Sequence, residues 1–106
     1  MVKVENMTDY LEEDITELTS KDKVLLKFYS VTCAPCRMIS TEIAKLVEDN
    51  DIDATIYDID VESCPELAGE YGVFSVPTLV FLNNGEEYHR NSGFLPKQQI
   101  KSILNK

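Results

Sequence analysis

The sequence predicts an α/β domain with one central mixed β-sheet: a parallel core, an antiparallel C-terminal hairpin and about four flanking helices. Two observations support this prediction. Short apolar runs alternate with segments whose apolar residues recur every three or four positions. An Asn-Gly pair, typical of a tight hairpin turn, separates the last two strand-like runs. With 106 residues and no repeat, low-complexity tract or linker, we expect a single domain over 1–106.

The strands follow from the apolar runs. They are expected at 2–4, 24–29, 54–59, 77–82 and 86–90. The run at 24–29 is almost continuously apolar, which is typical of a strand covered on both faces.

The helices follow from the apolar spacing. Leu11, Ile15 and Leu18 share one helical face, and a second such stripe predicts a helix over about 34–49. A short helix is expected at 65–71, ended by Gly72, and Pro96 opens the last helix.

Composition excludes several functions. The formal net charge is −9, with 19 acidic against 10 basic residues, and this balance repels a phosphate backbone, so no nucleic-acid binding is expected. No stretch approaches the roughly 18 uninterrupted apolar residues that a membrane span needs, so no membrane association is expected either. Residues 1–6 lack the basic and apolar regions of a secretory signal, which favours a cytoplasmic protein.

Two of the three cysteines, Cys33 and Cys36, have C-x-x-C spacing between a buried strand and a helix. A cysteine at a helix N-terminus faces unpaired N–H groups and the positive end of the helix dipole, which stabilise the attacking thiolate. Arg37 is expected to add to this potential. Pro35 fixes the backbone in the first turn, where no N–H is needed. Cys36 lies close enough to resolve a mixed disulfide.

The same spacing also fits half of a zinc site, or two cysteines that merely pack. Zinc needs about four ligands, and the further candidates, Cys64 and His89, are far apart and not in ligand spacing. We therefore expect no metal and no bound cofactor. Cys64 is expected to pack as a small hydrophobe, and His89 to be exposed on the hairpin.

Several short motifs extend over nearly the whole chain in a fixed order. They are Phe28-Tyr29-Ser30, Cys33-Ala34-Pro35-Cys36-Arg37-Met38, Asp58-Ile59-Asp60, Tyr71-Gly72-Val73, Val76-Pro77-Thr78, Gly85 and Ser92-Gly93. In this order and spacing the chain resembles the thioredoxin family. The resemblance implies a thioredoxin fold and a protein disulfide reductase. It also implies disulfide-containing protein substrates, a flavin-dependent thioredoxin reductase as electron donor, and a monomer.

Three further roles come from the resemblance. Pro77 matches a cis-proline that lies against the cysteine pair in this family, and only X–Pro bonds adopt cis at low cost. Val76 would then offer its backbone to an extended substrate segment. Gly93 would keep the surface that faces the substrate open. From the residues alone, Pro77 fits a plain strand start and Gly93 an ordinary turn equally well.

The chain departs from the family pattern at two positions that matter for the site. Thr32 stands where a tryptophan usually precedes the first cysteine, so an aromatic contact surface is missing. Lys27 occupies the position of a buried aspartate that exchanges protons with the second cysteine. Lys27 either reaches water or an acid such as Asp58, or stabilises the thiolate and makes the disulfide a stronger oxidant.

Two alternatives remain open at this point. One is a glutaredoxin-like enzyme that uses glutathione, against which the middle pair Ala34-Pro35 counts. The other is a binding module that has kept the fold and lost the chemistry; the survival of both cysteines counts against it.

Overall fold

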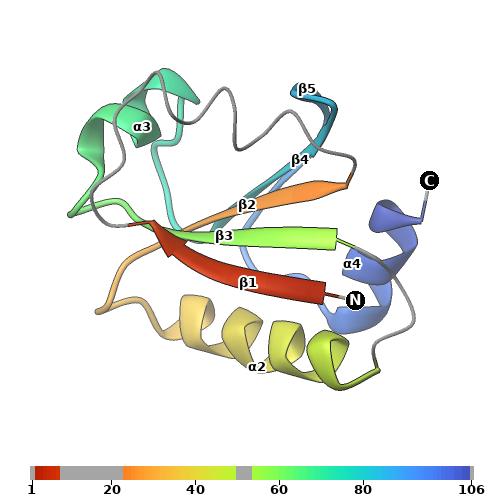
Figure 1. Ribbon diagram of the computed structural model, residues 1–106. Helices are drawn as coiled ribbons and strands as arrows, with labels where there is room; N and C mark the ends of the chain where they lie inside the picture. Colours follow the sequence, from red (N-terminus) through yellow and green to blue (C-terminus); the bar gives the residue numbers. More distant parts are fainter. Residues whose placement is uncertain (1, 8–22, 50–53, 106) are drawn as a thin grey trace.

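The computed structural model describes residues 2–7, 23–49 and 54–105 (Figure 1). The elements in these ranges are β1 (Val2–Met7), β2 (Val24–Tyr29), α2 (Ala34–Asp49), β3 (Ala54–Asp60), α3 (Pro65–Glu70), β4 (Thr78–Asn83), β5 (Glu86–Ser92) and α4 (Lys97–Leu104). The predicted α/β order is confirmed. The helix expected around Leu11, Ile15 and Leu18 lies outside the described residues. None of the described helices has the length and apolar character to cross a membrane.

The strands form one five-stranded sheet in the order β1-β3-β2-β4-β5. β1 and β2 both run parallel to β3, whereas β4 is antiparallel to β2 and β5 is antiparallel to β4. The predicted parallel core with an antiparallel C-terminal hairpin is therefore confirmed. The hairpin turns at Asn84 and Gly85, both at positive φ (53° and 86°), as a type I′ turn requires.

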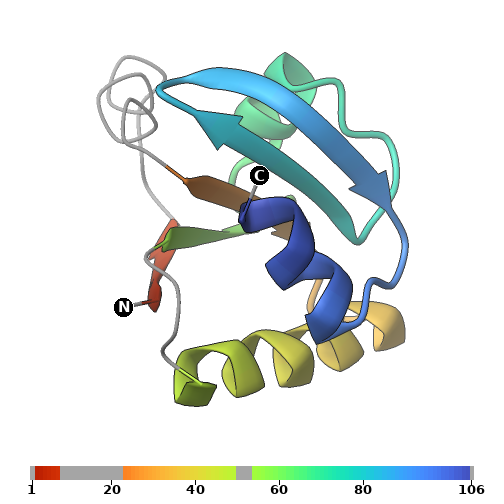
Figure 2. The ribbon, with the colours of Figure 1, turned by 90° about the vertical axis from the view of Figure 1, so that its right-hand side faces the viewer.

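Helices cover both faces of the sheet. α2 and α4 lie on one face and α3 on the other (Figures 1 and 2). Because side chains alternate along a strand, β2 supplies both layers: Leu25 packs in the cluster with α2 and α4, while Leu26 and Phe28 pack in the cluster with α3. β2 is thus buried on both sides, which explains its continuous apolar run.

Element ends differ from the sequence prediction by a few residues. β4 begins at Thr78 rather than at Pro77, since proline has no N–H to donate to a ladder. α3 ends at Glu70, with Tyr71 as its C-cap, and Pro96 is the N-cap of α4 rather than its first residue. β1, β3 and β5 are each longer than predicted.

Two contacts attach α4 to α2. The backbone N–H of Lys97 donates to Oε1 of Glu42 at 2.9 Å, and Nζ of Lys97 lies 2.7 Å from Oδ2 of Asp49. The first turn of α4 is thereby fixed to the helix that begins at the cysteine motif. β5 forms an edge of the sheet, and its Glu86, Glu87 and His89 side chains are exposed.

Candidate active site

The cysteine motif lies where the central strand passes into α2. After β2 the chain turns, with the N–H of Cys33 donating to the carbonyl of Ser30 at 3.2 Å, and α2 starts at Ala34. Cys33 and Cys36 form a disulfide with their Cα atoms 5.3 Å apart. Cys33 is half-buried, whereas Cys36 is only 2% exposed. A partner molecule can therefore reach the first sulfur but not the second.

The start of α2 is electrically suited to a thiolate. The N–H of Cys36 donates to Sγ of Cys33 at 3.2 Å, so a helix-terminal donor already points at the outer sulfur. The first turn of α2 contains no acidic residue to oppose the helix dipole. Pro35 lies in that turn, and Arg37 follows it as an exposed cation.

The loop before the motif is tied to the loop after β3. Ser30 Oγ lies 3.1 Å from Oγ1 of Thr32 and donates to Oε1 of Glu62 at 3.4 Å. Thr32, the residue before Cys33, is exposed. The position that carries an aromatic ring in the family pattern is therefore small and polar here.

The start of β4 lies beside the C-terminal end of β2, next to the cysteine motif. The Val76–Pro77 peptide bond is cis, the geometry that the family resemblance implies. The N–H of Gly93 donates to the carbonyl of Pro77 at 2.8 Å. In the register, Phe28 of β2 pairs with Thr78. Pro77 and Gly93 thus lie beside the end of β2 from which the cysteine loop departs.

Gly93 fits an open surface position. Its φ is +94°, which side chains rarely adopt, and a Cβ there would meet nothing within 4 Å. Val76 is half-buried and Pro77 is buried.

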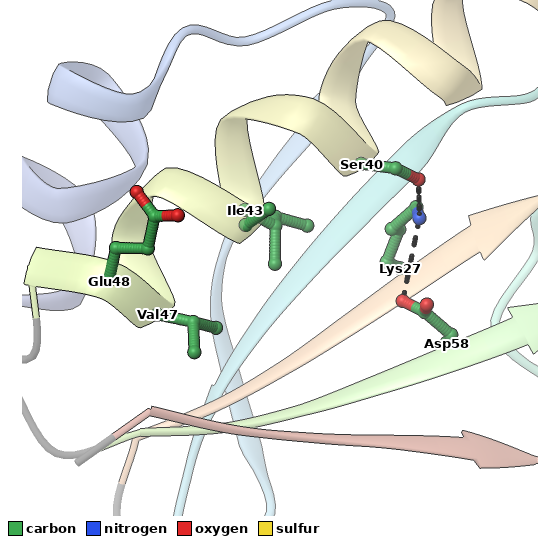
Figure 3. Close-up of a pocket in the computed structure, with 7 residues that line it drawn as sticks. Lys27, Ser40, Ile43, Val47, Glu48 and Asp58 are labelled. Atoms are coloured by element: carbon green, nitrogen blue, oxygen red, sulfur yellow. Dashed lines mark hydrogen bonds and ion pairs between the residues drawn. The ribbon is translucent and has the colours of Figure 1, made fainter.

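Lys27 is a buried cation on the α2 face of the sheet. It is 2% exposed, and Asp58 is its register partner on β3. Its Nζ lies 3.5 Å from Oδ1 of Asp58, donates a hydrogen bond to Oγ of Ser40 on α2 (Figure 3), and sits 5.0 Å from the centre of the Tyr29 ring. The ammonium is therefore enclosed by an acid, a hydroxyl and an aromatic face.

Two opposing effects act on the pKa of Asp58. Burial raises the pKa of its carboxyl, and the Lys27 ammonium only partly offsets this rise. Oδ1 is fully buried and accepts no well-formed hydrogen bond from the described residues, since its 3.5 Å approach to Nζ is long for one. The ion pair is thus incompletely satisfied.

A groove of about 480 Å³ runs along this cluster between α2 and the sheet (Figure 3). Lys27, Ser40 and Asp58 line it at one end, and Ile43, Val47 and Glu48 continue it along α2. Its polar end therefore coincides with the enclosed ammonium.

The two further candidate zinc ligands, Cys64 and His89, lie in different parts of the structure. Cys64 is buried at the N-cap of α3, in the hydrophobic cluster on the α3 face of the sheet. His89 on β5 is exposed, and the centre of its ring lies 5.6 Å from the centre of the Phe81 ring. Within the described ranges no group of three histidine, cysteine or acidic side chains is arranged to hold a metal.

The structure identifies two further candidate site residues that the sequence analysis did not. Ser40 donates to the carbonyl of Cys36 at 3.1 Å while accepting from Lys27, and Phe74 is 96% exposed in the segment that leads to Pro77. The signal for Ser40 was its place four residues after Cys36, one helical turn on. Phe74 carried no periodic signal.

An accessible cysteine at a helix start, with a buried partner one turn on, defines a dithiol–disulfide oxidoreductase. The chain matches the thioredoxin family over residues 2–106. It is 36% identical to a thioredoxin of Bacillus subtilis (strain 168) over 95 residues, 90% of this chain and 91% of that protein. A thioredoxin of Listeria monocytogenes is 34% identical over 88 residues, 83% of this chain and 85% of that one.

Comparison with solved structures shows the same fold. A mutant thioredoxin from Halobacterium salinarum NRC-1 superposes with a TM-score of 0.83 at 31% identity, over 97% of this chain and 88% of that one. The chain belongs to the thioredoxin family, and it catalyses thiol–disulfide exchange through Cys33 and Cys36.

Proposed function

We propose that this exchange runs in the direction of reduction, with disulfides of other proteins as substrates. The Cys33 thiolate attacks one substrate sulfur, forming a mixed disulfide and releasing a substrate thiolate, which takes a proton from water. Cys36 then gives its thiol proton to water, and the resulting thiolate attacks Sγ of Cys33 and releases the second substrate thiolate, which is protonated from water in turn. Two electrons pass to the substrate, and the Cys33–Cys36 disulfide remains.

The observation that carries these roles is the difference in burial. Only Cys33 is open to an incoming disulfide, whereas Cys36 is enclosed and lies within reach of Cys33. The N–H of Cys36 stabilises negative charge on Sγ of Cys33 before that sulfur attacks the substrate disulfide.

Exposed apolar side chains on the segments around the motif support a protein substrate. Val31 precedes the motif, Phe74 precedes Pro77, and Phe94 follows Gly93; all three are exposed. Exposed apolar groups concentrated near one site are typical of protein contact surfaces. The backbone of Val76 and the bare surface at Gly93 would accept an extended segment of the substrate.

Lys27 takes the electrostatic role in this proposal. Its ammonium is enclosed and connected to Cys36 through Ser40, so it favours thiolate and hence the reduced pair. The disulfide becomes a stronger oxidant. Asp58 moderates the effect, and exposed Arg37 adds a weaker, solvent-screened contribution. Lys27→Asp is expected to lower the reduction potential; an equal or higher potential would contradict this role.

The remaining expectations follow family membership. We propose a single domain over 1–106 that acts as a monomer in the cytoplasm. An external dithiol donor must regenerate the pair, and the family implies a flavin-dependent thioredoxin reductase. No residue of the described chain identifies that partner.

The test is reduction of insulin disulfides with dithiothreitol as the electron source. Cys33→Ser is expected to abolish the accelerated rate, and Cys36→Ser to accumulate a mixed disulfide visible by mass spectrometry. An unchanged rate in Cys33→Ser would favour the binding module. Turnover driven by glutathione alone, without thioredoxin reductase, would favour the glutaredoxin-like alternative.

A further inference from the structure

Ser40 makes two contacts that no other described hydroxyl on α2 combines. Its Oγ donates to the carbonyl of Cys36 at 3.1 Å and accepts a hydrogen bond from Nζ of Lys27 (Figure 3). A serine that bonds the carbonyl four residues earlier is a common helix feature with little consequence by itself. The contact with a buried ammonium is what sets Ser40 apart.

Thr41 provides an internal comparison. Its Oγ1 donates to the carbonyl of Arg37 at 3.3 Å, which is the same back-bond one position along α2. Both residues are exposed, but Ser40 also accepts a hydrogen bond from Lys27, a lysine that is only 2% exposed. The two residues therefore separate the helix back-bond from the contact with Lys27.

Besides the Tyr29 ring, the Lys27 ammonium has two polar neighbours. On one side is Ser40, attached to the peptide of the second cysteine; on the other is Asp58, 3.5 Å away and not fully hydrogen-bonded. Without the Ser40 hydroxyl, the ammonium would settle against Asp58, since that carboxylate still has acceptor capacity. Its positive potential at the cysteine pair would then be cancelled more completely.

We propose that Ser40 is a positioning residue that holds the Lys27 ammonium on the cysteine side of its enclosure and so sets the redox balance of the pair. This inference rests on the proposed role of Lys27. Ser40 touches neither sulfur in the contacts described and acts through Lys27.

The test is the equilibrium of the Cys33–Cys36 pair against a glutathione or dithiothreitol redox buffer. Ser40→Ala is expected to favour the disulfide three- to tenfold, a fall of about 15–30 mV for a two-electron couple. Ser40→Thr, which keeps the hydroxyl, and Thr41→Ala, which removes only an exposed back-bond, are expected to match the parent. In a Lys27→Met background, Ser40→Ala is expected to add nothing.

Each other outcome overturns the inference. An unshifted Ser40→Ala would show that the hydroxyl does not matter. An equal shift in the Lys27→Met background would show that Ser40 acts through the helix and not through Lys27. If Lys27→Met itself leaves the equilibrium unchanged, the role of Lys27 fails together with that of Ser40. The measurement needs no substrate turnover, so failure of the insulin assay remains distinguishable from each of these results.

Discussion

The backbone N–H of Cys36 lies 3.2 Å from Sγ of Cys33, in the first turn of α2. A donor fixed by the helix needs no rearrangement when charge develops on that sulfur. The same geometry leaves Cys36 enclosed by protein. The two sulfurs are thus chemically unequal although the two cysteines are only three positions apart in the sequence.

Alkylation of the reduced protein should reveal this inequality. At neutral pH, Cys33 is expected to react with iodoacetamide at least about threefold faster than in the urea-unfolded chain, because a larger thiolate fraction outweighs its lower nucleophilicity. Cys36 and Cys64 are buried and should react more slowly. Peptide-resolved mass spectrometry separates the three. A Cys33 rate equal to that in urea would refute the proposed activation.

Lys27→Met should destabilise the fold by leaving Asp58 without its counter-charge. Breaking a fully buried pair costs about 3–5 kcal/mol, and the 20% exposure of the Asp58 side chain reduces this to about 1–3 kcal/mol at pH 7. Since the pKa of Asp58 is raised in the folded state, the penalty exists above that pKa and is relieved as the pH falls through it.

Urea denaturation at pH 7 and pH 4 measures this effect. The double variant Lys27→Met/Asp58→Asn is the matched control, because it removes both charges, and should recover much of the loss at pH 7. If the single and double variants are equally unstable, the loss comes from packing rather than from an unpaired carboxylate.

Gly93→Ala should separate substrate access from stability. The positive φ of +94° costs an alanine about 1–2 kcal/mol, although its Cβ meets no atom within 4 Å. Gly72→Ala is the matched control, with φ +65° and equally open space. Only Gly93→Ala should lower kcat/KM for insulin, while a small aromatic disulfide should be reduced normally. Equal activity of both variants toward insulin would remove Gly93 from the substrate surface.

Phe74→Ala should weaken protein recognition at little structural cost. The ring is 96% exposed, so its removal should change the free energy of unfolding by less than about 0.5 kcal/mol. The KM for protein disulfides should rise severalfold, with kcat preserved. Val47→Ala removes an exposed apolar side chain near the far end of α2 and should leave KM unchanged. A normal KM in Phe74→Ala would exclude a substrate contact there.

Glu42→Gln should weaken the attachment of α4 to α2 in a pH-dependent manner. The N–H of Lys97 and, next, the side chain of Lys45 lower the pKa of Glu42. The ionised carboxylate therefore stabilises the fold above its unfolded pKa of about 4.3, and this stabilisation is lost as the pH falls through the lowered folded value.

The measurement is the Tm of parent and variant at pH 7 and pH 3. Glu42→Gln should melt lower than the parent at pH 7, and the difference should shrink at pH 3. Glu86→Gln removes the same charge from an exposed position on the hairpin and should show no such pattern. A difference that persists at pH 3 would mean that the lost contact is not ionic.

Sequence patterns predicted the described fold well because burial leaves a direct mark on composition. β2 is covered on both faces and reads as a continuous apolar run, and α2 shows the stripe that faces the sheet. The cysteine motif was equally visible, since its chemistry depends on local spacing.

The surroundings of Lys27 were only half visible. Strand alternation places Lys27 and Asp58 on the face that α2 covers, and Asp58 was named as a possible partner. Ser40 was missed because its contact depends on how α2 is rotated against the sheet, which spacing alone does not determine. The exposure of Phe74 belongs to a loop, where no periodicity reports burial.

The exposed charged side chains of the edge strand β5 oppose pairing of this strand with another chain. An outer strand presents unpaired peptide groups that invite another chain to extend the ladder. β5 carries charged side chains along this edge: Glu86, Glu87 and Arg90. The Arg90 guanidinium lies 2.9 Å from Oε1 of Glu87. An approaching copy carries the same net charge of −9, which repels it. The protein can thus display an apolar contact region near its disulfide while the β5 edge resists pairing with another copy.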